Sequence, residues 1–269
     1  MKVTILGCGG SGGVPLIGPG WGECNPDNPK NRRRRVSILV QQQHTNIICD
    51  TSPDFREQVL AADIHHLDAV LYTHDHADHT QGIDDLRFVR SKDKSLANRV
   101  PVYGTAETLG TLRHRFGYAF AQKTEGSGHL YKPFLEPMLV GSHPFKVAGI
   151  DVTPYEQSHG FGSVTTGYRI GNMAYSTDCV DLPDASMDQL EGLDLFIVDC
   201  LRFEPHQTHA HFDKALAWVE ALQPRHTVLT HMNHLVDYDV IKARCPKGVE
   251  PGYDGLVIEI PDALRDEQK

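Results

Sequence analysis

The sequence predicts an α/β sandwich, in which two packed β-sheets carry helices on their outer faces, and three observations lead to this prediction. Short apolar segments with the composition of strands recur along most of the chain. Amphipathic helical patterns are interspersed among them, and these are fewer than the strands. This mixture favours two sheets packed face to face with the helices outside. A chain of 269 residues can bury the core that such an architecture needs.

The expected strands are rich in Val, Ile, Thr and Tyr, which suit a pleated and half-buried surface. In the first half of the chain they occupy residues 3–6, 36–40, 46–50, 68–73 and 101–104. In the second half they occupy residues 151–157, 165–170, 172–177, 194–200, 226–231 and 254–260. These segments are numerous enough to build both sheets.

Two stretches have the strongest helical patterns. Residues 52–64 begin with Ser52 as the expected N-cap and Pro53 at the first helical position. Residues 211–224 place apolar side chains on one helical face and end at a proline. Shorter helices are expected at residues 83–90, 106–117 and 185–192.

Two long segments are expected to be loops. Residues 118–142 have only weak periodicity, and residues 12–35 are rich in Gly, Pro and Asn. Long loops in compact domains are often functional. We find no linker or low-complexity segment, so residues 1–269 are expected to form a single domain.

Charge and cysteine content exclude several classes of protein. The net charge of −9 argues against a broad surface for nucleic acids. No stretch approaches the roughly 20 apolar residues of a membrane span. The six cysteines form no CxxC pair, which favours reduced thiols over a disulfide framework. We therefore expect a cytoplasmic protein that binds neither large nucleic acids nor membranes.

Histidines and aspartates gather where expected strands end. The stretch THDHADH at residues 73–79 follows one strand, and His159, Asp178 and His231 follow three others. If these strand ends share one edge of the sheets, their side chains converge. Imidazole nitrogen and carboxylate oxygen are suitable ligands for Zn, Mn or Fe. The sequence therefore predicts a metal site at that edge.

The stretch THDHADH holds too many ligands for one ion. His74 and His76 alternate in an extended segment and can point the same way, whereas Asp78 and His79 follow a bend. A site with two ions needs a bridging carboxylate, and Asp178 is available. A polar surface loop and a purely structural metal site are the alternatives. The second would more often be rich in cysteine, which this set lacks.

The motif HDHADH and the order of the later residues resemble the metallo-β-lactamase superfamily. The resemblance implies an αββα sandwich of two mixed β-sheets flanked by helices, with two divalent ions at the sheet edge. It assigns the first ion to His74, His76 and His159. It assigns the second ion to Asp78, His79 and His231, with Asp178 as the bridge. Asp50, after the third strand, would orient ligands and loops.

Three further segments resemble the PhnP-type phosphoribosyl cyclic phosphodiesterase branch of that superfamily. They are GCGGSGGVP at the N-terminus, NPKNRRRR at residues 28–35 and THAHFDKAL at residues 208–216. PhnP-type proteins hold an additional structural zinc through three cysteines near the N-terminus and a histidine. This chain has only Cys24 in that stretch and retains His234, so the sequence does not decide whether the zinc site exists.

The resemblance implies a phosphodiesterase with a small, phosphorylated and nucleotide-like substrate. A hydroxide bound to the two ions would attack phosphorus, and a histidine would protonate the leaving oxygen. The resemblance places this general acid at His211, with His209 as the second candidate. Both also suit a histidine-rich loop before a helix, with no role in catalysis.

A glycine-rich turn and an arginine run are candidates for phosphate binding. Ser11, Gly12 and Gly13 follow the first strand, where backbone N–H groups can face a phosphate. Such a turn is more often only a tight connection. The run from Arg32 to Arg35 can hold phosphate or an anionic leaving group, although charge runs are usually solvated.

Two other functions compete with phosphodiester hydrolysis. The same fold can hydrolyse a thioester or another ester without phosphate, and a non-catalytic nucleotide-binding protein is the alternative outside enzymes. The sequence leaves the oligomeric state open, a homodimer included.

Overall fold

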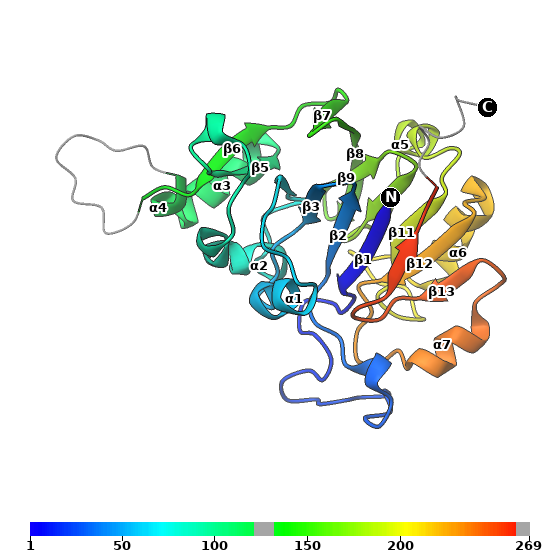
Figure 1. Cartoon of the computed structure of the whole chain (residues 1–269). Coiled ribbons are helices and arrows are strands. Elements are labelled where there is room, and N and C mark those ends of the chain that lie inside the picture. The colour runs from blue at the N-terminus through cyan, green and yellow to red at the C-terminus, as the bar shows by residue number, and fades with distance from the viewer. Residues whose placement is uncertain (121–131, 262–269) are drawn as a thin grey trace.

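The computed structural model describes residues 1–120 and 132–261, and its centre consists of two seven-stranded sheets (Figure 1). The first sheet has the order β14-β1-β2-β3-β4-β5-β6. Its strands are β1 (Lys2–Gly7), β2 (Ser37–Gln42), β3 (Thr45–Cys49), β4 (Ala69–Leu71), β5 (Val100–Gly104), β6 (Leu135–Leu139) and β14 (Val257–Glu259). The second sheet has the order β13-β12-β11-β10-β9-β8-β7. Its strands are β7 (Phe145–Val147), β8 (Ile150–Gly160), β9 (Ser163–Ile170), β10 (Met173–Ser176), β11 (Leu195–Asp199), β12 (His226–Thr230) and β13 (Val249–Pro251).

Helices lie outside the two sheets (Figure 1). On the side of the first sheet they are α1 (Phe55–Ala61), α2 (Ala77–Thr80), α3 (Ala106–Arg115) and α4 (Gly117–Phe120). On the side of the second sheet they are α5 (Asp184–Gln189), α6 (Phe212–Leu222) and α7 (Tyr238–Arg244). Short 3₁₀ helices are η1 (Pro29–Asn31), η2 (Gln81–Phe88) and η3 (Lys94–Leu96). The predicted sandwich of mixed sheets with flanking helices is confirmed.

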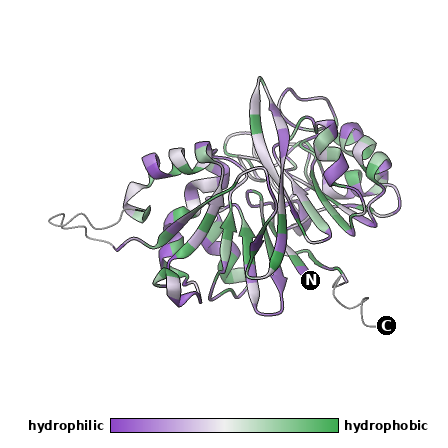
Figure 2. Cartoon of the chain, turned by 90° about the horizontal axis from the view of Figure 1, so that it is seen from above, coloured by the Kyte–Doolittle hydropathy of each residue, from purple (hydrophilic) through white to green (hydrophobic). Residues whose placement is uncertain are grey.

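Strand alternation divides the core into layers. In β2, Ile38 and Val40 join the cluster between the sheets, whereas Leu39 joins the cluster beneath the helices on the outer face. Ile47 and Ile48 in β3 divide in the same way, because neighbouring side chains of a strand point to opposite faces. Figure 2 shows hydrophobic residues concentrated along the strands. The first sheet is therefore buried on both faces, which explains the near-continuous apolar runs of its central strands.

Parallel strands bring the polar strand ends to one edge of the sandwich. In the first sheet β3, β4 and β5 are parallel neighbours, and in the second sheet β10, β11 and β12 are. The sheets are joined at this edge, because Thr166 N donates a hydrogen bond to Thr73 O over 2.9 Å. Tyr168 Oη similarly donates to Tyr72 O over 2.8 Å. Residues that follow the parallel strands of both sheets therefore meet.

Most predicted elements are present, and the differences are local. The helix expected at 52–64 begins only after Asp54, and the Ser52 hydroxyl accepts the N–H of Asp54 in a turn before it. Of the helix expected at 83–90, residues 83–88 belong to the 3₁₀ helix η2 instead of an α-helix, and residues 89 and 90 lie beyond its end. The loop expected at 118–142 contains part of α4 and all of β6, and its residues 121–131 lie outside the described residues. No helix in the described ranges is long and apolar enough to cross a membrane.

The long N-terminal loop is held by hydrogen bonds of the Arg33 side chain. The Arg33 side chain is buried, and its guanidinium donates to Val236 O at 2.7 Å and Asn233 O at 3.0 Å. Cys24 Sγ lies 3.2 Å from Val236 O and 3.5 Å from the backbone oxygen of His234. In the part of the chain that the structure describes, Cys24 belongs to no group of metal-capable side chains. Cys24 and His234 therefore do not fit a structural zinc site.

Candidate metal centre

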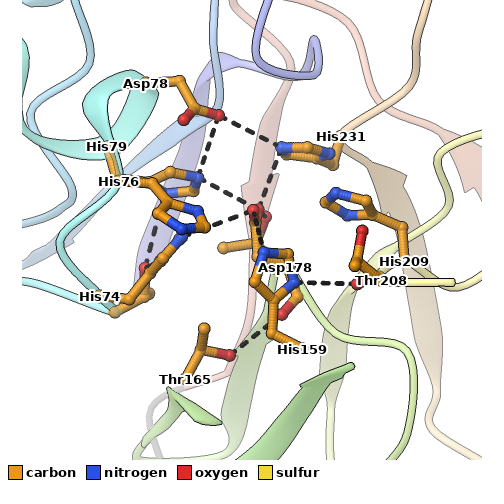
Figure 3. A network of polar contacts seen from close by, with 12 residues as sticks. His74, His76, Asp78, His79, His159, Thr165, Asp178, Thr208, His209 and His231 are labelled. Atoms are coloured by element: carbon orange, nitrogen blue, oxygen red, sulfur yellow. Dashed lines mark hydrogen bonds and ion pairs between the residues drawn. The ribbon is translucent and has the colours of Figure 1, made fainter. Parts of the chain in front are cut away.

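The polar residues predicted as metal ligands converge at the shared edge of the two sheets (Figure 3). His74, His76, His159 and Asp178 form one group whose ligand atoms lie within 4.8 Å of one another. Asp78, His79, Asp178 and His231 form a second such group. Of the residues in these two groups only His76 is exposed, so the centre is open on the side of that residue.

Asp178 lies between the two groups and gives one carboxylate oxygen to each. Its Oδ2 lies 3.6 Å from Nε2 of both His74 and His159. Its Oδ1 lies 3.1 Å from His79 Nε2 and 3.0 Å from His231 Nε2. Two ligands bound tetrahedrally to zinc at about 2.0–2.1 Å lie roughly 3.3 Å apart. The separations are therefore those of ligands that share an ion, with Asp178 placed as a bridge.

Unpaired ring nitrogens support the same conclusion. Nε2 of His74, His79 and His231 is buried in each case and makes no hydrogen bond of normal geometry. A buried polar atom without a partner costs free energy, so native structures usually satisfy it. A divalent cation at each group would satisfy these nitrogens, and the residues present therefore fit two such ions.

Hydrogen bonds behind the ligands orient their rings. His79 Nδ1 lies 2.7 Å from Asp50 Oδ2, and Thr73 N donates to Asp50 Oδ1 over 2.9 Å. His159 Nδ1 lies 2.9 Å from Thr208 O. Because Nδ1 carries the proton in each of these bonds, Nε2 presents its lone pair to the centre. Asp50 thus lies where the resemblance places it, behind the ligand His79.

Burial and charge oppose one another at the centre. Burial raises the pKa of the Asp178 carboxyl, but His231 and His79 hold that pKa well below its usual range. Burial lowers the pKa of His231, yet the carboxylates, Asp178 foremost, raise it to about 10. Burial lowers the pKa of His74 well below its usual value and also lowers that of His159. The carboxylates need nearby positive charge, which a proton or a metal ion can supply.

The backbone is strained at the residues that enter the centre. Asp50, Asp178 and His231 have φ values of 63°, 52° and 60°, in the left-handed region that non-glycine residues seldom adopt. Each lies just beyond β3, β10 or β12, where the chain turns sharply. Strain of this kind persists where the surrounding structure over-determines it, often at functional sites. His159 differs, because it lies within β8 instead of after it.

The two candidates for the general acid lie in different places. The His209 ring stacks on His231 at 4.6 Å between centroids and lies 5.0 Å from the His159 ring (Figure 3). His211 is the N-cap of α6, where its side chain forms no capping hydrogen bond. Among the described residues, His209 joins a group of metal-capable side chains and His211 joins none. The structure thus brings His209 to the centre and leaves the first candidate, His211, outside it.

Asp199 is a residue that the sequence reasoning did not select. It is fully buried at the end of β11, and its Oδ2 lies 2.9 Å from His209 Nδ1. The N–H of Cys179 also donates to this oxygen over 2.9 Å. Its position in the sequence could have identified it, because Asp199 is the last residue of an apolar strand, just as Asp178 and His231 follow the ends of apolar strands. Asp199 therefore fixes the orientation of the His209 ring.

Asp75 and the glycine-rich turn are also placed by the structure. The Asp75 carboxylate forms an ion pair with Arg115 of α3 at 3.3 Å, and it belongs to neither ligand group. The N–H of Gly13 donates to Gly10 O over 2.8 Å and cannot also bind a phosphate. The N–H groups of Ser11 and Gly12 have no acceptor in the described part of the chain. Only these two remain available as the predicted phosphate donors.

Known proteins resemble the chain in sequence and in structure. The sequence profile of the Beta-lactamase superfamily domain matches residues 45–232. A crystal structure described as a new diphosphatase from the PhnP family superimposes with a TM-score of 0.87 at 37% identity, over 97% of this chain and 98% of that chain. Zn²⁺-bound PqqB from Methylobacterium extorquens superimposes with a TM-score of 0.73 at 20% identity, over 97% of this chain and all of that one. At that identity the second similarity shows the fold alone.

A longer relative has a different described activity. An octanoyltransferase from Porphyromonas gingivalis is 32% identical over 260 residues, which are 95% of this chain. The chain spans about half of the length of that relative, 51%. The profile match, the two mixed sheets and the clustered His and Asp side chains agree with one another. The chain therefore belongs to the metallo-β-lactamase superfamily, and its clustered His and Asp side chains could hold metal ions.

Proposed function

We propose that this protein is a dinuclear-metal hydrolase that cleaves a phosphodiester or diphosphate bond in a small nucleotide-like or phosphoribosyl substrate. The observation that carries the proposal is the pair of His209 and Asp199 beside the bridged metal centre. The 37% identical diphosphatase supports it, because the alignment with that structure covers nearly the whole of both chains. Phosphodiesters and diphosphates share the feature that matters here, a phosphorus atom with a bridging oxygen that leaves.

The ligands and their supporting residues define what the protein contributes. Divalent ions held by these residues supply Lewis acidity and make water nucleophilic near neutral pH. Zn and Mn both suit the His/Asp donor set, and Fe is a third choice. Asp178 holds the two ligand groups at a fixed separation, and Asp50 and Thr208 fix the rings of His79 and His159. The scissile phosphate would enter on the side of the exposed ligand His76.

His209 is the proposed donor of the proton that the leaving oxygen requires. Asp199 Oδ2 accepts Nδ1–H, so Nε2 is the nitrogen left to carry a second proton. Asp199 also holds the ring in a fixed orientation, as a carboxylate does behind a catalytic histidine elsewhere. When the bond between phosphorus and the bridging oxygen breaks, the Nε2 proton passes to that oxygen. The neutral ring remains held by Asp199.

Purified protein loaded with Zn or Mn tests this function directly. We expect hydrolysis of bis(p-nitrophenyl) phosphate and of either a 2′,3′-cyclic nucleotide or a dinucleoside diphosphate. Asp178→Ala is the negative control, because it removes the carboxylate shared by both groups. Absence of hydrolysis with every divalent metal, in protein whose metal content has been measured, would contradict the proposal.

A second candidate function follows from the octanoyltransferase of Porphyromonas gingivalis. Its similarity extends over 95% of this chain, which favours an acyl substrate such as a thioester at the same centre. The chain matches only about half of that relative, so the named activity can reside in the other half. An octanoyl thioester and the lactam nitrocefin, assayed beside the phosphodiesters, separate the two functions. Faster turnover of the thioester would replace our first proposal with the second.

A further inference from the structure

His76 differs from the other two histidines of its ligand group. The His74 ring is oriented by a contact of 3.0 Å between its Nδ1 and Thr73 Oγ1, and the His159 ring by the contact with Thr208 O. The His76 ring lies 4.4 and 5.2 Å from those two rings, measured between centroids, but it forms no hydrogen bond with any residue that the structure describes. It is also the only exposed member of the group. The orientation of the His76 ring therefore depends more than the others on the backbone that carries it.

Two side chains hold this backbone, one on each side of His76. Thr80 Oγ1 donates a hydrogen bond of 2.8 Å to His76 O. On the other side, the Arg115 guanidinium donates through Nη1 to Asp75 O and pairs through Nη2 with Asp75 Oδ2 at 3.3 Å. Asp75 is the residue between the ligands His74 and His76. One guanidinium thus contacts both the backbone and the side chain of the residue that separates two ligands of one ion.

Arg115 reaches this segment from a helix that is fixed independently of the metal centre. It is the last residue of α3, and Leu109 and Leu112 of that helix are buried in the outer layer of the core. Thr105 Oγ1 accepts the N–H of Thr108 over 3.2 Å and caps the start of the helix. The guanidinium therefore ties the ligand segment to a packed support 40 positions away in the sequence.

The contact with the backbone oxygen matters more than the ion pair. The side chains of Arg115 and Asp75 are 42% and 30% exposed, and ion pairs this accessible to water contribute little to stability. A hydrogen bond from a guanidinium to a carbonyl oxygen is charge-assisted and directional. The carbonyl in question belongs to the peptide group that joins Asp75 to His76. Holding that group fixes the place from which the His76 side chain starts.

We propose that Arg115 is a positioning residue for the first ion: it holds the peptide group between Asp75 and His76, so that the exposed ligand stays directed at the ion that it shares with His74 and His159. The second ion should not depend on this contact, because the ligands that it does not share with the first lie within α2 or after β12. The inference concerns the retention of metal and is independent of which bond the protein cleaves.

Metal affinity, measured without turnover, tests this inference. Zinc is removed stepwise from the loaded protein by a competing chelator. Arg115→Ala should weaken the binding of the first ion about 10–100-fold, as substitutions that release a metal ligand from its support commonly do, and leave the second ion in place. Arg115→Lys retains the charge but lacks the planar fork, so it should recover only part of the affinity.

Cobalt substitution identifies which ion is affected. His76→Ala serves as the reference, because it removes the ligand itself and changes the visible absorption of cobalt in the first group. Arg115→Ala should change the same absorption bands in the same direction. Thermal unfolding of the metal-free variants measures any general loss of stability. A lower unfolding temperature with the parent's cobalt spectrum would show that Arg115 only stabilises the fold.

A double-mutant cycle separates the two contacts of Arg115. Asp75→Ala removes the ion pair and keeps the backbone oxygen, so it should weaken the first ion by less than about fivefold. Asp75→Ala combined with Arg115→Ala should weaken it no further than Arg115→Ala alone, because the single substitution already removes both contacts. Losses that multiply in the double variant would contradict the proposed contact.

Arg113→Ala provides the matched control. Arg113 lies in the same last turn of α3, is exposed, and has no ion-pair partner in the described parts of the chain. Its replacement should leave the affinity for both ions unchanged.

Two results would overturn the inference. Unchanged affinity for the first ion in Arg115→Ala is one, and an equal loss of both ions is the other. Hydrolysis of bis(p-nitrophenyl) phosphate is measured separately on the same samples. Selective loss of the first ion in Arg115→Ala, with no hydrolysis even by the fully loaded parent, would refute the proposed function and retain the role of Arg115. Hydrolysis by the parent with unaltered metal binding in the variant would refute only the role of Arg115.

Discussion

Replacing His209 with alanine removes the proposed proton donor and leaves the ligands of both metal groups in place. General acid catalysis typically contributes about 10²–10⁴-fold to a rate. This range corresponds to about 3–5 kcal/mol of transition-state free energy. The Asp199 contact of 2.9 Å and the stacking on His231 at 4.6 Å hold the ring in one orientation, so we expect a loss of kcat within that range.

The assay compares two leaving groups. A 2′,3′-cyclic nucleotide releases an alkoxide, which needs a proton, whereas p-nitrophenolate departs as a stable anion. His209→Ala should therefore lose most activity on the cyclic nucleotide and much less on bis(p-nitrophenyl) phosphate. His211→Ala is the control, because it lies two residues away and forms no capping hydrogen bond. We expect it to retain activity within about twofold, since surface changes of this kind are usually nearly neutral.

Metal analysis of the same samples makes the result decisive. His209→Ala should retain the metal content of the parent, because the two bridged ligand groups do not include His209. If His211→Ala lost more activity than His209→Ala, the assignment from the structure would be wrong. If His209→Ala lost metal in parallel with activity, His209 would be a ligand, as its place in a third group beside Asp199 would allow.

Three further predictions concern the metal centre. Asp178→Ala should reduce the metal content after dialysis well below that of the parent protein, because the Asp178 carboxylate belongs to both ligand groups. Retention of the full metal content would contradict the bridging role. Asp50→Asn should weaken metal affinity about 10–100-fold in a chelator competition, because the substitution weakens the hydrogen bond that orients the His79 ring. An unchanged metal affinity would refute this role of Asp50. Zinc binding to the metal-free protein at pH 7 should release protons, because the pKa of His231 is raised to about 10 and that of His79 is raised as well. A ring that is protonated at pH 7 must lose its proton before it binds zinc, so the affinity for zinc should rise as the pH rises towards 10. Heats of zinc binding that do not depend on the ionisation enthalpy of the buffer would contradict this prediction.

The fold can be predicted from the periodicity of apolar residues, and the ligand set from the position of His and Asp residues in the sequence. Val, Ile and Tyr in short runs identify the strands, and the place of His74, Asp178 and His231 relative to strand ends indicates a common edge. The ligands meet because the strands pair in parallel, and parallel neighbours end on the same side of a sheet. The motif at residues 74–79 contributes to both ligand groups, as its spacing suggests. The chain bends at the start of α2, so the residues up to His76 join one group and those from Asp78 onward join the other.

Long-range contacts account for what the sequence leaves out. Whether His209 or His211 faces the centre depends on the turn before α6, where a shift of two residues is invisible to a helical pattern. Asp199 acquires its role only through the contact with His209. The burial of Arg33 depends on residues about two hundred positions away, so an arginine run resembles a solvated surface until the loop is seen folded. Such pairings are determined by tertiary structure and not by local composition.

The location of bound metal tests the central claim most directly. Anomalous diffraction from zinc-loaded crystals, together with the zinc content of the same protein, locates each ion without reference to activity. The account predicts two ions about 3.5–4 Å apart. One should be bound by His74, His76 and His159, and the other by Asp78, His79 and His231, with Asp178 between them. A single ion, or an ion bound by Asp199 and His209 in place of either, would contradict the account.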